Sequence, residues 1–258
     1  MSEEEEILDL GMFEEPADFR PPAAEHHFAL YERVTTKAPS TINLRLVGKS
    51  PLWGHLLWNA GKYTANYIDE HAEELVRGKR ILELGAAAAL PSLICGLNGA
   101  SEVICTDYPD PDLIENIQYN VDHCQELSPQ AVKVRGYIWG GEKAGIYGVE
   151  EKKMVLEDEK FDLIILSDLV FNHTEHLKLL QDCRDLLKRD GKVFVVFSPH
   201  RPRLLSNDLE FFKTAEQYEF KSVQNDLVIW KPMFEEDDET AEIRARVYSY
   251  FLIPQWIE

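Results

Sequence analysis

Basic residues are scarce in this sequence. Its 258 residues include 27 Lys and Arg against 46 Asp and Glu, which gives a formal net charge of −19. Because neutralising phosphates requires Lys and Arg, this balance argues against nucleic acid as the main ligand. An acidic surface favours basic partners such as Lys-rich peptide tails, and it also serves solubility alone.

Long apolar runs and paired cysteines are also lacking. No stretch reaches the roughly 18 apolar residues of a membrane span, so we expect no membrane association. The four cysteines, Cys95, Cys105, Cys124 and Cys183, are scattered along the chain. This usage is typical of a reducing compartment, and we expect a cytoplasmic protein.

Three familiar catalytic motifs are missing. Without His-Glu-x-x-His, and with His173 and His176 lacking a third ligand nearby, no metal site is expected. Ser198 lies in Phe-Ser-Pro and not in a Gly-x-Ser-x-Gly elbow, so hydrolase chemistry is unsupported. A complete Gly-x-Gly-x-x-Gly is absent too, which argues against a nucleotide-dependent oxidoreductase.

Alternating strands and helices dominate the chain after Gly78. Apolar runs predict strands over 79–84, 102–106, 132–138, 161–167 and 193–197, and amphipathic segments predict helices over 91–97, 112–127, 174–187 and 207–218. Two final strands, 221–230 and 243–252, follow with no helix between them, which indicates an antiparallel edge. The sequence therefore predicts an α/β fold, a Rossmann-like, seven-stranded, mostly parallel sheet with helices on both faces.

The chain divides into three predicted parts. Residues 1–22 are acidic and then proline-rich, typical of a disordered tail. Residues 23–76 form an extension, with a strand over 41–47 and a helix from about Pro51 to Val76. Residues 77–258 form the Rossmann-like domain.

The first strand of that domain leads into the most informative motif, Ile81 to Ala89. Gly85 has no side chain to block a ligand, and the alanines that follow keep the wall thin. Asp107 ends the second strand 22 residues later, near the spacing at which nucleotide folds place a ribose-binding carboxylate. S-adenosyl-L-methionine fits this turn, because it carries a ribose but no phosphate for a glycine cradle. The acid at Glu83 also suits a methyltransferase better than a dehydrogenase.

These residues resemble the seven-β-strand (class I) methyltransferases, and more narrowly the lysine methyltransferase family 16. The resemblance covers about residues 42–258. Asp168 to Phe171 matches the Asp-x-x-Tyr or Asp-x-x-Phe motif that this family has after its fourth strand. The family usually has Gly-x-Gly-x-Gly at the first turn, whereas Ala87 and Ala89 replace two glycines here.

The resemblance implies the following cofactor contacts. Gly85, Ala86 and Ala87 would line the methionine part of S-adenosyl-L-methionine, next to Glu83. A second set would hold its adenosyl part: Asp107 at the ribose, Trp139 against adenine, Ser167 beside the cofactor, and Trp58 as a cover. Trp53 competes with Trp58 for that last role, and Trp139 has a structural alternative as a loop anchor.

The resemblance also implies which residues act on the substrate. Asp168 would orient an amine, Phe171 would form an apolar wall, and Asn172 would add a hydrogen bond. A structural alternative for Asp168 is capping of the following helix.

The implied activity is methylation of a protein amine. The segments 52–55, 84–91 and 106–110 resemble a fungal subgroup that modifies the N-terminal α-amine or a nearby lysine of translation elongation factor 1-alpha. The resemblance implies a monomer with this protein substrate. Two alternatives stay open: an N-methyltransferase for nicotinamide-type small molecules, and a catalytically silent methyltransferase fold that binds a partner.

Overall fold

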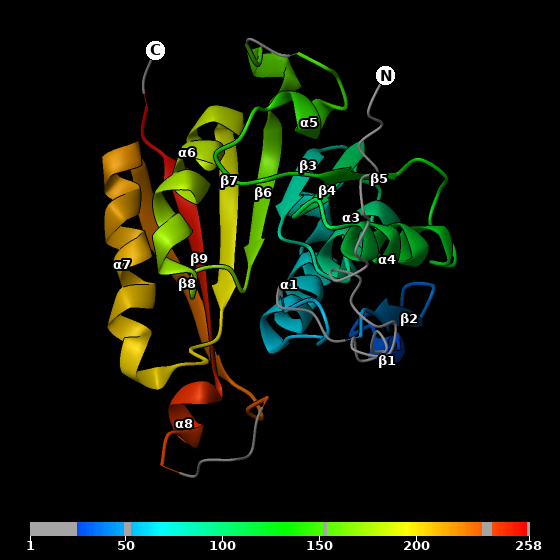
Figure 1. The fold of residues 1–258 in the computed structure, drawn as a ribbon, viewed down its shortest axis with the longest axis horizontal. Helices are drawn as coiled ribbons and strands as arrows, with labels where there is room; N and C mark the ends of the chain where they lie inside the picture. The colour runs from blue at the N-terminus through cyan, green and yellow to red at the C-terminus, as the bar shows by residue number, and fades with distance from the viewer. Residues whose placement is uncertain (1–24, 49–52, 152–153, 234–238, 257–258) are drawn as a thin grey trace, which may run out of the picture.

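A single seven-stranded sheet organises the protein (Figure 1). The computed structural model describes residues 25–48, 53–151, 154–233 and 239–256. The strand order is β5-β4-β3-β6-β7-β9-β8, and β9 alone of these runs in the direction opposite to the other six. The predicted fold class is confirmed, including the antiparallel edge.

The bounds of the strands follow the buried apolar runs of the sequence. They are β3 (Arg80–Leu84), β4 (Glu102–Asp107), β5 (Val132–Gly136), β6 (Phe161–Ser167), β7 (Leu187–Phe197), β8 (Phe220–Ile229) and β9 (Arg246–Pro254). Residues on both faces of β6 are buried, as expected of a central parallel strand, so its sequence shows an apolar run rather than an apolar–polar alternation.

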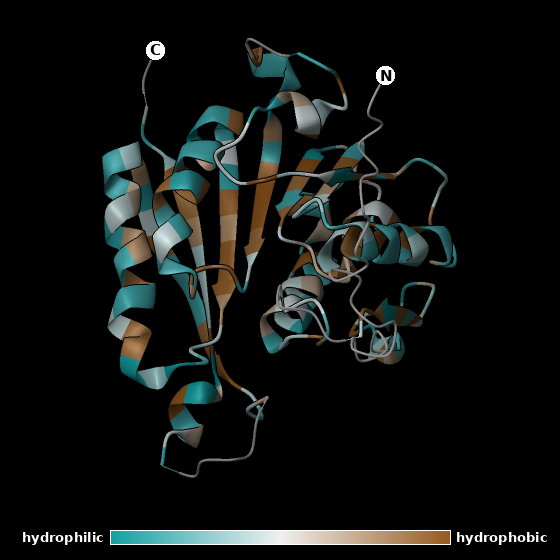
Figure 2. Ribbon diagram, in the orientation of Figure 1, coloured by the Kyte–Doolittle hydropathy of each residue, from teal (hydrophilic) through white to brown (hydrophobic). Residues whose placement is uncertain are grey.

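Helices cover both faces of the sheet. One face packs against α1 (Asn59–Glu70), α3 (Leu90–Leu97) and α4 (Pro111–Asp122), and the other against α6 (His176–Leu186) and α7 (Leu205–Ala215). Figure 2 shows mostly brown, apolar strands in the middle of the sheet and helices with mixed teal, white and brown residues beside them. Each face of the sheet has its own hydrophobic core, and successive residues of β3 belong to different ones. Ile81 packs on the α1 side and Leu82 on the α6 side. This alternation follows from the pleat of the strand.

A hairpin of β1 (His27–Glu32) and β2 (Thr41–Leu46) precedes the sheet. Its Arg33 forms a buried, two-pronged ion pair with Asp69 at the end of α1. On β2, the Arg45 backbone N–H donates to Asn120 and the Arg45 side chain donates to Asn116, both on α4. The hairpin is therefore bound to two helices of the first face.

Several predicted bounds were wrong in detail. The helix predicted from Pro51 begins at Asn59 and breaks at His71, where α2 (Ala72–Leu75) follows; Pro51 itself lies outside the described residues. The segment between β5 and β6 contains α5 (Ala144–Tyr147), and α8 (Ala241–Arg244) lies between β8 and β9, where no helix was predicted. Shorter 3-10 turns occur at η1 (Glu157–Glu159), η2 (His173–Glu175), η3 (Pro202–Leu204) and η4 (Glu216–Tyr218).

The division into a tail, an extension and a domain stays a prediction, and residues 1–22 lie outside the described residues. Among the helices that the structure describes, none combines the length and apolar character needed to cross a bilayer.

Candidate functional site

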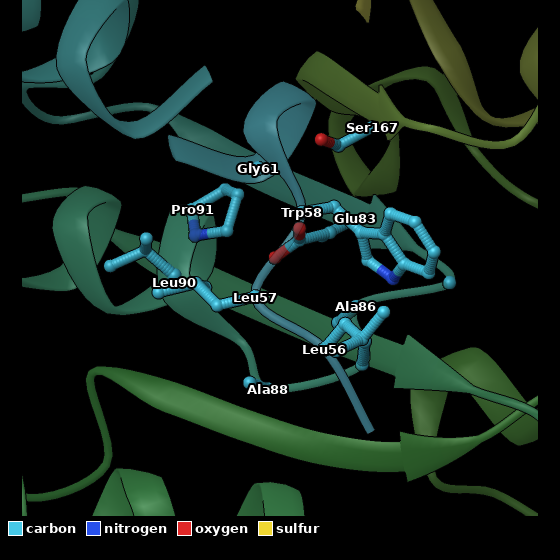
Figure 3. A pocket seen from close by; sticks show the side chains of 12 residues that line it. Leu56, Leu57, Trp58, Gly61, Glu83, Ala86, Ala88, Leu90, Pro91 and Ser167 are labelled. Atoms are coloured by element: carbon cyan, nitrogen blue, oxygen red, sulfur yellow. The ribbon is translucent and has the colours of Figure 1, made fainter. Parts of the chain in front are cut away.

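A pocket opens where β3 and β6 end, at the carboxyl edge of the sheet (Figure 3). Three segments meet there: the turn after β3 with the start of α3, the segment entering α1, and the last residue of β6. The residues that line it are Leu56, Leu57, Trp58, Gly61, Glu83, Gly85, Ala86, Ala87, Ala88, Leu90, Pro91 and Ser167. In open α/β sheets this edge is where ligands bind.

The turn after β3 needs a residue without a side chain at its first position. Gly85 has a φ of 66°, and a Cβ built there would lie 2.6 Å from Cδ2 of Leu169 and 3.2 Å from Cζ2 of Trp139. Ala87 and Ala89 also have left-handed backbones, with φ values of 50° and 65°. The alanines that replace two family glycines thus occupy positions that favour glycine.

Asp107 lies directly against this turn. Its carboxylate accepts hydrogen bonds of 2.7 Å from the backbone N–H groups of Ala87 and Tyr108. Burial raises the pKa of Asp107 to about 6, although these two bonds favour the charged form. The structure therefore brings together the glycine turn and the carboxylate that the sequence predicts to flank one ligand.

Glu83 is a buried carboxyl group on the pocket wall. It accepts hydrogen bonds from the backbone N–H of Ser92 at 2.9 Å and from the Ser92 hydroxyl at 2.5 Å. Burial outweighs these bonds and raises its pKa to about 8, with a smaller contribution from the charge of Asp107. Glu83 is therefore largely protonated at neutral pH.

Of the two competing tryptophans, Trp58 lines the pocket. Its Nε1 donates to the Trp53 carbonyl oxygen at 3.0 Å, while the Trp53 side chain is half exposed. Ser167 lines the same pocket, with its hydroxyl 3.2 Å from that of Thr64. Trp139 is half-buried against the core and behind Gly85, so both interpretations of this ring stay open.

The structure places Asp168 just after the last residue of β6. Asp168 is buried, has a φ of 60°, and accepts hydrogen bonds from the Ser198 N–H at 3.2 Å and from His200 Nε2 at 2.7 Å. Its carboxylate therefore does not cap the following helix, and that alternative was wrong. The Phe171 carbonyl oxygen accepts from Arg201, and the Asn172 side chain accepts from the Thr174 hydroxyl at 3.2 Å.

His200 was missed at the level of sequence. It follows the fifth strand of the parallel set as Asp168 follows the fourth, so only the pairing of β6 with β7 brings the two side chains together. The sequence did contain one signal for it: His200 lies three residues beyond the buried strand β7, at the edge of the sheet where ligands bind.

No cluster of metal-ligating side chains occurs among the residues described by the structure. His173 bonds Asp208 at 2.7 Å, and His176 bonds the Val170 carbonyl oxygen at 2.7 Å. Both rings thus have protein partners.

Comparison with known proteins identifies the family. A family model described as lysine methyltransferase matches residues 42–218. This chain belongs to the lysine methyltransferase family. The predicted resemblance is therefore confirmed, and S-adenosylmethionine is the cofactor of this fold.

Curated relatives of this methyltransferase match nearly end to end. "Protein N-terminal and lysine N-methyltransferase EFM7" of Debaryomyces hansenii is 63% identical, over 98% of this chain and 99% of its own length. The protein with the same name from Candida albicans is 57% identical, over 99% of this chain and 100% of its own. The one from Schizosaccharomyces pombe is 43% identical, over 93% of both chains.

Solved structures with little sequence similarity share the methyltransferase fold. SMU.776 in complex with SAH has a TM-score of 0.59 at 12% identity, covering 82% of this chain and 54% of that one. P. horikoshii TYW2 in complex with MeSAdo has a TM-score of 0.50 at 11% identity, covering 87% of this chain and 69% of that one. Both matches concern the fold alone.

Proposed function

We propose that this chain transfers methyl groups from S-adenosylmethionine to the N-terminal α-amine or a nearby lysine of translation elongation factor 1-alpha. We further propose that it does so as a cytoplasmic monomer. The observation that carries the proposal is the near-complete match to relatives named protein N-terminal and lysine N-methyltransferases, together with a pocket at the matching turn. Four free cysteines agree with a reducing compartment.

The residues of the pocket fit the cofactor. Gly85 lets the turn pack closely against Leu169 and Trp139, and two carboxyl groups, Glu83 and Asp107, lie at the ends of adjacent strands. Each oxygen of Asp107 receives one backbone N–H and keeps a lone pair, so it can accept from ribose hydroxyls. Glu83 can pair with the amino group of the methionine part, and Trp58 offers a flat apolar cover.

S-adenosylmethionine supplies an activated methyl group on a sulfonium, so the protein has to position the amine and favour its neutral form. Only the neutral amine attacks, and free lysine has a pKa of about 10.4 against about 8 for an α-amine. Asp168 and the Phe171 carbonyl oxygen are the acceptors we assign to orient the amine, and the Phe171 ring is the apolar wall. Asn172 provides a further polar group. Exclusion of water by this wall favours the neutral amine.

The charge of the chain supports a basic protein substrate. At a net charge of −19, its long-range field attracts positively charged surfaces and speeds their encounter. The field does not select the methylated residue, which depends on the site itself.

The test is methyl transfer from labelled cofactor to purified elongation factor 1-alpha, with the modified residue located by peptide mass spectrometry. We expect label at the N-terminus or a nearby lysine with the wild-type chain. Asp168→Ala and Phe171→Ala should abolish most of it while cofactor affinity, measured by calorimetry, stays within about threefold. Asp226→Ala, on β8, is the matched control and should keep full activity.

Each alternative has its own outcome. Label in nicotinamide and not in protein would favour the small-molecule enzyme. Cofactor binding with no labelled product in a complete cell extract would favour the silent binder. Either result would overturn the proposed substrate.

A further inference from the structure

His200 connects the two halves of the site. It lies in the loop after β7, and its side chain is mostly buried, with 18% of its surface exposed. Its Nε2 is 2.7 Å from Oδ2 of Asp168. Its ring packs against the Trp58 ring in a T-shaped arrangement, at a centroid distance of 4.7 Å and an interplanar angle of 62°. Trp58 belongs to the cofactor pocket, whereas Asp168 belongs to the proposed amine site.

Neighbouring contacts bind the same two loops together. The Ser198 N–H donates to the other oxygen of Asp168, and the Arg201 guanidinium donates to the Phe171 carbonyl oxygen at 2.5 Å. The Ser198 hydroxyl is buried and has no hydrogen-bond partner among the residues that the structure describes. The loop after β7 therefore fixes the loop that carries Asp168 and Phe171.

Asp168 needs such support because its backbone is strained. A left-handed φ costs a non-glycine residue roughly 1–2 kcal/mol, and strain of this kind persists only where the surroundings hold it. The bonds from Ser198 and His200 are the contacts that hold the Asp168 carboxylate in this conformation.

Charged groups around His200 favour its protonated form. Burial by itself lowers the pKa of His200, but the Asp168 carboxylate outweighs it and the pKa is raised. Asp208 adds to this effect, and Arg201 opposes it.

We propose that His200 is a positioning residue for methyl transfer: it holds the Asp168 carboxylate at the amine site and the Trp58 ring at the cofactor pocket in one arrangement. The inference rests on the proposed function for its catalytic consequence. Its two contacts differ in kind, one a hydrogen bond and the other a ring packing, so they can be removed separately.

Two substitutions separate these contacts. His200→Gln keeps an N–H donor for Asp168 but loses the ring against Trp58. His200→Phe keeps a ring against Trp58 but loses the donor. For His200→Phe we expect kcat on the protein substrate to fall at least tenfold, with the Kd for S-adenosylhomocysteine within about threefold of wild type. For His200→Gln we expect kcat within about threefold and a Kd weakened three- to tenfold.

His123→Gln and His123→Phe, at an exposed histidine beyond α4, are the matched controls and should change neither quantity. A general loss of structure would lower kcat and weaken Kd together in both His200 variants. That result, or wild-type values in both, would overturn the inference.

A measurement without turnover distinguishes this inference from the proposed function. A double-mutant cycle compares the unfolding midpoints of wild type, His200→Phe, Asp168→Asn and the double variant. We expect the midpoint of the double variant to fall by less than the sum of the two single decreases. Additive losses would overturn the inference even if the wild-type chain methylates its substrate. If the wild-type chain methylates no protein but the cycle and the Kd pattern hold, the proposed function fails and the positioning role stands.

Discussion

The backbone N–H of Ala87 donates a 2.7 Å hydrogen bond to the carboxylate of Asp107. This bond joins the turn after β3 to the end of β4, two strands that pair in parallel with Leu84 opposite Thr106. It fixes both the conformation of the turn and the direction of the carboxylate. The shape of the candidate pocket therefore depends on a contact between the two segments that border it.

Replacing Asp107 by asparagine tests that dependence. The substituted side chain would keep one acceptor for the two N–H donors of Ala87 and Tyr108, and it would turn an amide N–H₂ toward the other. We expect the affinity of Asp107→Asn for S-adenosylhomocysteine to fall at least tenfold in calorimetry. Asp122→Asn, at the exposed end of α4, is the control and should bind as wild type does. Unchanged binding by the Asp107 variant would remove this residue from the cofactor site.

The left-handed alanines predict an unusual effect of glycine. Glycine at position 87 would relieve the backbone strain of Ala87, which is roughly 1–2 kcal/mol. It would also give the unfolded chain more conformational freedom, which lowers the free energy of unfolding by about 0.4–1 kcal/mol. We therefore expect Ala87→Gly to leave stability unchanged or to raise it by up to about 1 kcal/mol in urea unfolding. Ala86→Gly, at a neighbour without a positive φ, should lower stability by about 1 kcal/mol. Equal losses at both positions would contradict the strain argument.

Much of the fold could be predicted because burial leaves a local pattern in the sequence. The apolar run of β6 indicated its bounds correctly, and the spacing from Gly85 to Asp107 indicated two strand ends at one edge. The β1 strand was missed because Phe28 and Leu30, two of its apolar residues, are exposed while Tyr31 faces inward. No alternation of buried residues marks it.

Long-range pairing explains the other differences. The Arg-Asp-Gly segment at 189–191 has the composition of a helix stop, yet it lies inside β7, which starts at Leu187 opposite Phe161. The contact between His200 and Asp168 arises in the same way, from strands that are adjacent in the sheet, although the two residues are 32 positions apart along the chain. Such contacts depend on tertiary packing, which local propensity does not encode.

The ion pair between Arg33 and Asp69 is expected to determine whether the hairpin stays attached. Both side chains are fully buried. Burial by itself would raise the pKa of Asp69, but hydrogen bonds from Arg33, Thr35 and Asn98 outweigh it and lower the pKa to about 2. Removing Arg33 leaves the Asp69 carboxylate buried without its main partner. Arg33→Met should therefore lower the free energy of unfolding by about 3–5 kcal/mol at pH 7. Because the pKa of Asp69 is lowered, this contribution is present above about pH 4 and is lost as pH falls toward 2.

Urea unfolding of Arg33→Met against pH measures this difference. Arg77→Met is the control, because Arg77 and its partner Glu73 are exposed and their pair should contribute little. A difference between the Arg33 variant and wild type that stays constant down to pH 2 would contradict the assignment to Asp69.

Glu83 predicts a pH dependence of the opposite sign. Its pKa is raised from 4.5 to about 8 by burial, so the folded state prefers the neutral carboxyl group. Ionisation of this group destabilises the protein progressively as pH rises from about 4.5 to 8, and no further change is expected above that range. Glu83→Gln keeps an acceptor for Ser92 without the charge. Its unfolding midpoint should therefore rise relative to wild type between pH 5 and 8.

Glu102→Gln provides the contrast. Burial would raise the pKa of Glu102, but ion pairs with Lys133 and Arg80 outweigh it and lower the pKa. Glu102→Gln should therefore be less stable than wild type at neutral pH, and the difference in stability should shrink in acid.

Cofactor binding gives a second test of Glu83. A cationic amine nearby favours the carboxylate, so binding should release a proton from Glu83. Calorimetry in buffers of different ionisation enthalpy should detect this proton for wild type at pH 7 and not for Glu83→Gln. If both proteins release the same amount, the proton comes from another group and Glu83 does not face the cofactor amine.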